Sequence, residues 1–320
     1  MSTARIFLIG AVALFGVIGV LGWFKREPKP KVEPSPLIQE IAISSPKESK
    51  VVAPVEAPKP RSSEDLPEAD RIHQLFARDS SKFPFVETVS YTSRVPWMKD
   101  RPAWIADYAA HYETSRHFIA RSLNKKADYF TQKVGPGDKF NVFKKDKQVQ
   151  FHLLIDLSRS KMWFYAFDVD GNERILLKTY KVGLGRLDSQ KTSGYLTPIG
   201  KYELGEKVAI YKPGSVGFFQ NEKMEMIRIF GTRWIPFEKE LEKCTEPAKG
   251  LGLHGAPWMS DPVSGQLVED RSKIGKYDSD GCIRLAQEDI EEIFSVVITK
   301  PTQVQLVRDF HDAELPGVER

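Results

Sequence analysis

A long β-rich stretch constrains the fold of this chain more than any other feature of its sequence. Residues 149–185 read VQFHLLIDLSRSKMWFYAFDVDGNERILLKTYKVGLG, in which aromatic and branched aliphatic residues dominate. Such residues favour strands, and the turn-forming sequence Asp170-Gly171-Asn172 separates two of them. The stretch therefore predicts two strands, a turn and a third strand, with His152 as a structural residue of the first.

Shorter segments of the same kind follow. GKYEL, MIRIF and LGLHG each predict a strand, AQEDIEEIFSVV has the apolar spacing of a helix, and TQVQLVRDF predicts a last strand. Short strands with many glycines and one late helix indicate a mostly-β domain, sandwich-like or barrel-like, with local helices.

The N-terminus carries an apolar segment without a charged residue. It covers residues 6–24, about the length that a helix needs to cross a bilayer. We expect an uncleaved anchor rather than a secretory signal peptide, because the apolar region is long and no small-x-small cleavage site follows it. The basic stretch KREPKPK (residues 25–31) favours a cytoplasmic C-terminal part by the positive-inside tendency, so orientation needs other evidence.

Residues 25–67 separate this segment from the rest of the chain. They hold nine of the 21 prolines, among Lys, Glu, Ser and Val, and they lack the apolar mass to form a core. We expect a semi-extended tether that lets a globular part work at a distance from the membrane.

Residues 68–148 form a second region. AWIADYAAHYETSRHFIARSLN has apolar residues at helical spacing and predicts two helices, the second capped by Ser115. VGPGDKFNVF then predicts a turn at Pro136-Gly137 and a strand. Two helices followed by this strand resemble the end of a LysM module, which implies a glycan contact through residues 104–143. No first strand is evident before the helices, and a packing subdomain is the alternative.

Composition excludes several classes of protein. The net charge is +4 with mixed signs and no basic stripe with interleaved aromatics, so we expect no nucleic-acid partner. Two cysteines exclude a disulfide-dense scaffold and most structural zinc modules, and we expect neither a metal nor a cofactor. A disulfide between Cys244 and Cys282 is an alternative in an oxidising compartment and would block both thiols. A zinc site of both cysteines with His254 is disfavoured because no paired ligand spacing supports it.

Cys282 is the candidate nucleophile. It lies in YDSDGCIRL directly after Gly281, and a glycine there allows a tight turn whose amides converge on an oxyanion. A thiol needs a base to become a thiolate. His254, in LHGAPW, stands at a predicted strand end before Gly255, where a side chain can face a cleft. Taken alone, such a histidine or such a cysteine is more often structural.

Three motifs together resemble the L,D-transpeptidase catalytic domain of the YkuD type. They are TPIGKYEL, LHGAPW and SDGCIRL in this order, and the strands from HLLIDL onward resemble the start of that domain. The resemblance implies a β-sandwich-like fold and a peptidoglycan substrate. The cysteine of such enzymes attacks the carbonyl of the third stem-peptide residue, a diamino acid, and releases the terminal D-alanine. The acyl group then passes to an amine of a neighbouring stem, giving a 3→3 cross-link.

The resemblance also implies roles for two side chains and their surroundings. Cys282 would be the nucleophile, and His254 would be the general base that takes its proton and later returns it to the leaving amine. The main chain near Gly255 would orient the imidazole. Gly255 and Trp258 would line the substrate site.

The loop before the cysteine would supply the remaining groups. Ser279, Asp280 and Gly281 form this loop, and the amides around Gly281 and Cys282 would make the oxyanion hole. Arg284 would support the loop or hold a carboxylate of the substrate.

The sequence departs from the family pattern at Asp280, where the motif has a histidine. A carboxylate raises the pKa of a nearby thiol unless it is paired, and Arg284 or Lys276 could pair with it. Alternatively, the side chain points to solvent and does little. Our hypothesis is that Asp280 attracts a cationic amine acceptor and so favours transpeptidation over hydrolysis.

A second departure is the length of the segment between His254 and Ser279. It contains SDPVSGQLVEDRSK (residues 260–273), which predicts an inserted hairpin or loop that could cover the site.

The predicted chain is mostly β, with a β-sandwich-like catalytic domain preceded by a small α+β region and an N-terminal transmembrane helix. Its predicted parts are a transmembrane anchor (1–24), a proline-rich linker (25–67), a helical or LysM-like region (68–148), the catalytic domain (149–310) and a tail (311–320).

The leading functional prediction is a single-pass protein of the cytoplasmic membrane that acts on peptidoglycan stem peptides as an L,D-transpeptidase. Because the substrate lies outside, the catalytic domain is expected in the periplasm or on the outer face. One alternative is an L,D-carboxypeptidase that passes the same acyl-enzyme to water. Another is a catalytically inactive wall-binding protein. The sequence leaves the acceptor and the oligomeric state open.

Overall fold

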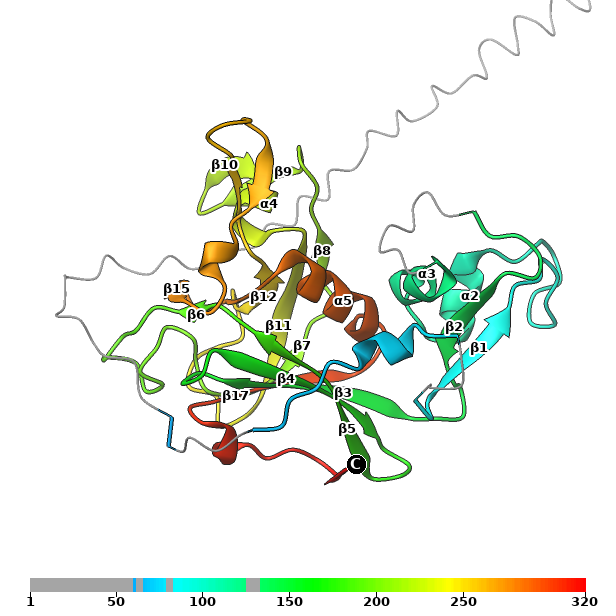
Figure 1. The fold of residues 1–320 in the computed structure, drawn as a ribbon, viewed down its shortest axis with the longest axis horizontal. Coiled ribbons are helices and arrows are strands. Elements are labelled where there is room, and N and C mark those ends of the chain that lie inside the picture. The colour runs from blue at the N-terminus through cyan, green and yellow to red at the C-terminus, as the bar shows by residue number, and fades with distance from the viewer. Residues whose placement is uncertain (1–59, 62–65, 79–82, 125–132) are drawn as a thin grey trace, which may run out of the picture. The chain divides into compact units, whose positions relative to one another are not determined.

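The computed structural model describes residues 60–61, 66–78, 83–124 and 133–320 (Figure 1). The predicted anchor lies outside these residues, as does nearly all of the predicted linker, so both stay predictions. Within the described residues, no helix is long and apolar enough to cross a membrane.

One ten-stranded mixed sheet forms the body of the protein. Its strands follow the order β16-β12-β11-β7-β17-β3-β4-β5-β18, and β8 pairs with β11 beside this path. The bounds of these strands are β3 (Val149–Asp156), β4 (Lys161–Asp168), β5 (Glu173–Lys181), β7 (Gly200–Leu204), β8 (Ala209–Ile210), β11 (Arg233–Glu242), β12 (Gly252–Gly255), β16 (Ile283–Leu285), β17 (Thr302–Val307) and β18 (Val318–Glu319).

Four small strand pairs and several helices complete the described part. The pairs are β1 (Val86–Ser90) with β2 (Lys139–Phe143), β6 (Leu184–Gly185) with β15 (Tyr277–Ser279), β9 (Val216–Phe219) with β10 (Glu222–Glu225), and β13 (Trp258–Ser260) with β14 (Leu267–Glu269). The α-helices are α2 (Ile105–His111), α3 (Arg116–Asn124), α4 (Ile227–Phe230) and α5 (Gln287–Val297), and the 3₁₀ helices are η1 (Ile72–Leu75), η2 (Arg271–Lys273) and η3 (Phe310–Asp312).

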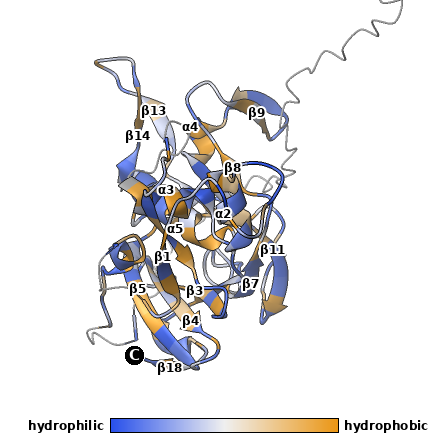
Figure 2. Cartoon of the chain, turned by 90° about the vertical axis from the view of Figure 1, so that its right-hand side faces the viewer, coloured by the Kyte–Doolittle hydropathy of each residue, from blue (hydrophilic) through white to orange (hydrophobic). Residues whose placement is uncertain are grey.

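The mostly-β prediction is confirmed, but the sandwich is replaced by a single curled sheet. Phe151 of β3 and Leu285 of β16 lie far apart in the strand order, yet both belong to one buried cluster that also takes in Phe294 of α5. The sheet therefore wraps around one core with α5 packed into it, and Figure 2 shows hydrophobic residues along β4, β5 and α5.

The other face of the sheet is covered by chain segments instead of a second sheet. The Trp163 ring packs on Phe310 with ring centroids 4.7 Å apart, and its indole N–H donates to the Pro67 carbonyl at 2.7 Å. Two segments distant in sequence thus close the apolar surface that would otherwise face water.

Most predicted elements are present where the sequence indicated them. β3, β4, β5, β7, β12, α5 and β17 correspond to predicted strands and the predicted helix. MIRIF, predicted as a strand, is wrong: it forms α4. The hairpin β9–β10 ends at Glu225, and Ile227 and Phe230 are buried one helical turn apart before Gly231 at φ +60° ends the helix.

The region before the sheet has the order β1-α2-α3-β2, so a first strand does precede the helices. The sequence did not indicate it because Val86–Ser90 reads VETVS, in which only two of the five residues are apolar. Ser115 caps α3 as predicted, since the Phe118 amide donates to its hydroxyl at 2.9 Å. The same hydroxyl donates to the Ser295 carbonyl in α5.

Candidate active site

The two candidate catalytic residues come together through neighbouring strands. β12 and β16 pair in parallel, with Leu253 opposite Ile283 and His254 opposite Arg284. Cys282 stands directly before β16, so its backbone lies next to the start of β12. The pairing of β12 with β16 thus brings the backbones of His254 and Cys282 near each other, as expected from the sequence.

Both side chains border one aromatic cluster. Met226, Phe230 and Trp234 form its buried centre, and Cys282 packs against it. The His254 ring lies edge-on to Phe230, with centroids 5.5 Å apart, and 6.0 Å from Trp234. α4 and β11 therefore supply an apolar wall beside the thiol and the imidazole.

His254 is held in one orientation by the main chain. Its side chain is buried, and Nδ1 lies 2.7 Å from the Gly255 carbonyl oxygen, which accepts the Nδ1 proton. That bond leaves Nε2 as the ring's acceptor. The pKa of His254 is lowered to about 3, first by burial and then by the charge of Arg284, while the hydrogen bond to the Gly255 carbonyl opposes both effects.

Gly255 also makes the close packing at this point possible. A side chain there would meet the Gly231 Cα and the Thr232 amide at 3.2 Å, and Ile290 of α5 at 3.4 Å. The end of β12 is thus pressed between the α4–β11 turn and α5, which fixes the position of the imidazole.

Cys282 is half-buried and neutral in the free protein. Its Sγ lies 3.5 Å from the Gly250 carbonyl oxygen. The pKa of the Cys282 thiol is raised to about 12, mainly by burial; a backbone hydrogen bond from Gly252 and the charge of Arg284 oppose this rise, and the charge of Asp280 adds to it. The thiol and the imidazole that border this aromatic cluster are thus both neutral at rest, which is not a thiolate–imidazolium pair.

The turn before the cysteine is closed by its own hydrogen bonds. The Ser279 hydroxyl donates to the Cys282 carbonyl at 2.7 Å and accepts from the Gly281 amide at 3.2 Å. Gly281 has φ +121°, and a Cβ there would stand 3.0 Å from the Leu196 carbonyl oxygen. Only glycine fits this conformation without strain.

Thr197 holds this turn from the side. Its buried hydroxyl donates to the Gly281 carbonyl at 3.0 Å and accepts from the Gly185 amide at 2.7 Å. Sequence reasoning assigned no role to Thr197, although the TPIG motif that carries the family resemblance was the signal. The threonine of that motif holds the turn that leads into Cys282.

Of the two amides predicted to bind the oxyanion, those of Gly281 and Cys282, this turn leaves only one available. The Gly281 amide already donates to Ser279, whereas no hydrogen bond between described residues uses the Cys282 amide. The amide of the cysteine itself is the donor that remains open.

The Arg284 side chain forms an ion pair with another residue of the protein. Its Nη1 donates to Asp278 at 2.5 Å, and Lys273 contacts the other oxygen of that carboxylate at 2.8 Å. Its buried Nε has no acceptor among the described residues. Of the two roles expected for Arg284, the geometry favours support of the loop.

Asp280 pairs with a residue that the sequence did not indicate. Its Oδ1 accepts from Arg186 Nη2 at 2.5 Å, so the expected partners Arg284 and Lys276 are wrong. Arg186 follows β6, and its amide donates to the Ser279 carbonyl at 3.0 Å, which brings it beside the loop. The parallel pairing of β6 with β15 could not be read from local sequence.

The segment 260–273 forms the predicted hairpin. Trp258 lies opposite Glu269 at its base, and Val263 near its tip is exposed. The Glu269 carboxylate accepts from the Gln287 amide at 2.6 Å, so the hairpin contributes a cap to α5. The Trp258 indole nitrogen is buried without an acceptor in the described chain.

The β9–β10 hairpin stands near this inserted hairpin, with α4 between them. Arg228 of α4 donates to the Ser260 hydroxyl at 3.3 Å, and both hairpins project on the side of the sheet where α4 lies (Figures 1 and 2).

Cys244 lies apart from this site. Its Sγ is 3.0 Å from the Lys201 carbonyl oxygen and packs beside Gly200, and both cysteines are free thiols.

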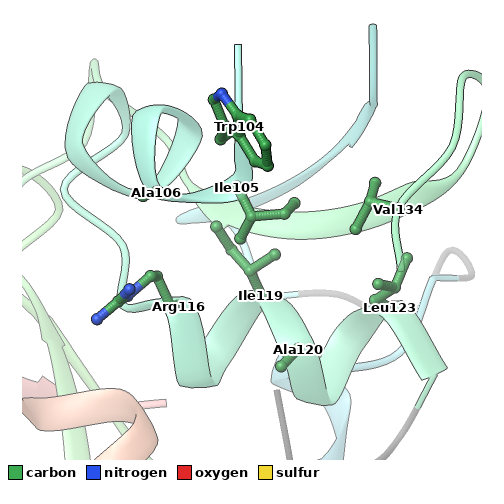
Figure 3. Close-up of a pocket in the computed structure, with 8 residues that line it drawn as sticks. All are labelled: Trp104, Ile105, Ala106, Arg116, Ile119, Ala120, Leu123 and Val134. Carbon is green, nitrogen blue, oxygen red and sulfur yellow. The ribbon is translucent and has the colours of Figure 1, made fainter. Parts of the chain in front are cut away.

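A pocket of about 210 Å³ lies outside this site, in the β1-α2-α3-β2 region. Trp104, 68% exposed, stands at its rim above Ile105, Ile119 and Leu123, with Arg116 at one side (Figure 3). An exposed indole next to an apolar hollow is a surface on which the face of a ring can stack.

Comparison with known proteins agrees with the motifs. Residues 150–306 match the model of the YkuD family, the L,D-transpeptidase catalytic domain. These residues belong to the YkuD family. The match spans the strands of the curled sheet from β3 to β17 and includes Thr197, His254 and Cys282.

Solved structures give distant similarities. The helical cell shape determining protein Pgp2 from Campylobacter jejuni matches at 19% identity and a TM-score of 0.34, over 53% of this chain and 50% of that protein. Bd1075 from Bdellovibrio bacteriovorus matches at 14% identity and a TM-score of 0.34, over 50% and 48%. The chain thus spans about half the length of each. No curated protein matches the sequence.

Proposed function

We propose that this protein is a peptidoglycan L,D-transpeptidase in which Cys282 is the nucleophile and His254 is the general base. The observation that carries the proposal is the parallel β12–β16 pair, which brings these residues together inside a YkuD domain. Stem peptides ending in D-alanine are the proposed substrates.

Acyl-enzyme formation begins with the neutral pair. As Sγ attacks the carbonyl of the third stem residue, its proton passes to Nε2 of His254, which the Gly255 carbonyl has left unprotonated. The Cys282 amide donates to the oxyanion, and Thr197 keeps that amide in place through Gly281. His254 then protonates the departing D-alanine.

The second half-reaction regenerates the free Cys282 thiol. An amine of a neighbouring stem attacks the thioester, the C–N bond forms as the C–S bond breaks, and the amine proton reaches the sulfur through His254. The apolar wall of Phe230 and Trp234 limits the access of water to the thioester, which favours aminolysis over hydrolysis.

Purified protein incubated with disaccharide-tetrapeptides tests the proposal, with products identified by mass spectrometry. Cross-linked dimers are expected from the wild type and from Cys244→Ala, and none from Cys282→Ala. Tripeptides without dimers would identify an L,D-carboxypeptidase. Unchanged substrate would favour a wall-binding protein without activity.

The proposed location is the cytoplasmic membrane, with residues 1–24 as a single-pass anchor and the catalytic domain in the periplasm or on the outer face. The location of the substrate supports it. A C-terminal alkaline phosphatase fusion should be active in cells, and an inactive fusion that is stably made contradicts this orientation.

A glycan contact in the region 104–143 is a second proposed function, favoured by the Trp104 pocket. Trp104→Ala should reduce co-sedimentation of the protein with insoluble peptidoglycan while acyl-enzyme formation on soluble fragments stays unchanged. Exposed Trp97→Ala is the matched control. Equal sedimentation of both variants and the wild type would exclude this contact.

A further inference from the structure

The Arg186–Asp280 ion pair stands at the edge of the nucleophile turn. Both side chains are about half exposed, at 55% and 52%, and they come from two segments that the β6–β15 ladder holds side by side. One residue, Gly281, separates the carboxylate from Cys282. Opposite charges are therefore fixed next to the reacting thiol and open to solvent.

The Arg186–Asp280 ion pair contributes little to the stability of the fold. Exposed ion pairs contribute about 0–1 kcal/mol. The main chain here is already held by the bonds of Arg186 to Ser279 and Leu196, and by Thr197. The side chains of Arg186 and Asp280 can thus exchange partners without loosening the turn.

In chemical terms the carboxylate alone would hinder the enzyme. The charge of Asp280 raises the pKa of Cys282 and so opposes thiolate formation. Arg186 offsets this charge in the free protein. An acceptor that brings its own ammonium group would replace Arg186 at the carboxylate and leave the guanidinium to bind an anion.

We propose that Arg186 and Asp280 together recognise an acceptor amine that carries a carboxylate on the adjoining carbon, as an amino-acid centre of a stem-peptide diamino acid does. Asp280 receives the amino group and Arg186 receives the carboxylate. The inference rests on the proposed function, because it concerns the acceptor of the Cys282 acyl-enzyme.

The charge on the attacking nitrogen fits this assignment. When the amine adds to the thioester carbonyl, its nitrogen becomes positively charged until His254 removes a proton. A carboxylate at this place stabilises that charge, whereas water, which has no carboxylate to bind Arg186, gains less. The pair thus favours amino-acid-like acceptors over simple amines and over water.

The test uses the full chain, a tetrapeptide donor, and glycine and glycinamide as competing acceptors, which differ in the carboxylate. The wild type should make more tripeptide-glycine than tripeptide-glycinamide. Arg186→Gln should reduce this preference by about tenfold or more, the size of a lost hydrogen bond to a charged group. Arg186→Lys should retain most of the preference.

Asp280→Asn should lower aminolysis by both acceptors relative to hydrolysis. Lys243→Gln removes one side of another exposed ion pair, with Glu314, and should leave both ratios unchanged. Ratios of products from one acyl-enzyme are insensitive to a partial loss of folded protein.

The inference is overturned if Arg186→Gln and Asp280→Asn keep the wild-type product ratios while the Cys282 acyl-enzyme forms normally. That result would leave the proposed function standing. A wild type that forms no acyl-enzyme at all would instead refute the proposed function, and this inference would fall with it.

Discussion

At the scale of single residues, the proposed nucleophile and its proposed base are both neutral in the free protein. Burial holds Cys282 as a thiol and His254 as a neutral imidazole. In the proposed reaction a substrate carbonyl would change this balance, because the oxyanion would be bound by the Cys282 amide and the thiol proton would pass to His254.

Alkylation of Cys282 should therefore rise steeply with pH. Because the pKa of its thiol is raised to about 12, the thiolate fraction should grow about tenfold per pH unit across the neutral and mildly alkaline range. Iodoacetamide labelling of the Cys244→Ser variant, followed by mass spectrometry, measures this directly. A plateau below pH 8 would contradict a buried, protonated resting thiol.

Thr197→Val should lower both the stability of the turn before Cys282 and the rate of the proposed reaction. The substitution keeps the shape but removes the bonds to Gly281 and Gly185, at a cost of about 1–3 kcal/mol in the free energy of unfolding. Because the Cys282 amide then loses its fixed position, we expect kcat to fall by at least about tenfold. The exposed Thr192→Val is the control; equal kcat values for both variants would remove Thr197 from the positioning of the turn.

At the scale of elements, local pattern predicted what local interactions decide. β3, β4 and β5 are long, apolar and bounded by turn residues, so their positions were readable in the sequence. α4 was missed because its four residues are short enough to read as a strand. The first strand of the small region and the partner of Asp280 depend on pairings between distant segments, which local pattern does not carry.

The same distinction, between local pattern and pairing of distant segments, separates the site residues that were predicted from those that were not. His254, Cys282 and Gly281 were found because motif residues and glycine have strict chemical and conformational requirements. Thr197 and Arg186 were not, because their roles arise only when β6, β15 and the TPIG segment meet.

The inserted hairpin should stabilise α5 through one carboxylate. Glu269 accepts from the Gln287 amide at the first turn of the helix, where negative charge is favoured. We expect Glu269→Gln to lower the free energy of unfolding by about 0.5–2 kcal/mol, measured by urea denaturation. Glu222→Gln, on the exposed β10, should have no effect, and equal losses from both changes would contradict the capping role.

At the scale of the whole molecule, buried histidines tie stability to pH. Burial lowers the pKa of His117 and His254 to about 3 and that of His152 to about 4. The unfolded chain binds these protons near pH 6.5, so the stabilisation is complete above that pH and is lost as the pH falls toward 3.

Each of these histidines should cost about 1.4 kcal/mol of stability per pH unit between about pH 6 and pH 4. Urea denaturation at several pH values measures this slope. His152→Phe should make the slope shallower by that amount and leave the thiol chemistry unchanged. An identical slope in the variant and the wild type would show that His152 takes up no proton on unfolding.

The strand order has a consequence for how the protein is made. β17 is the last long strand among the described residues, yet it lies in the middle of the sheet, between β7 and β3. During synthesis no strand bridges β7 and β3 until residues 302–307 have left the ribosome. Cys282 emerges earlier, so a nascent or truncated chain carries this thiol before its sheet is complete.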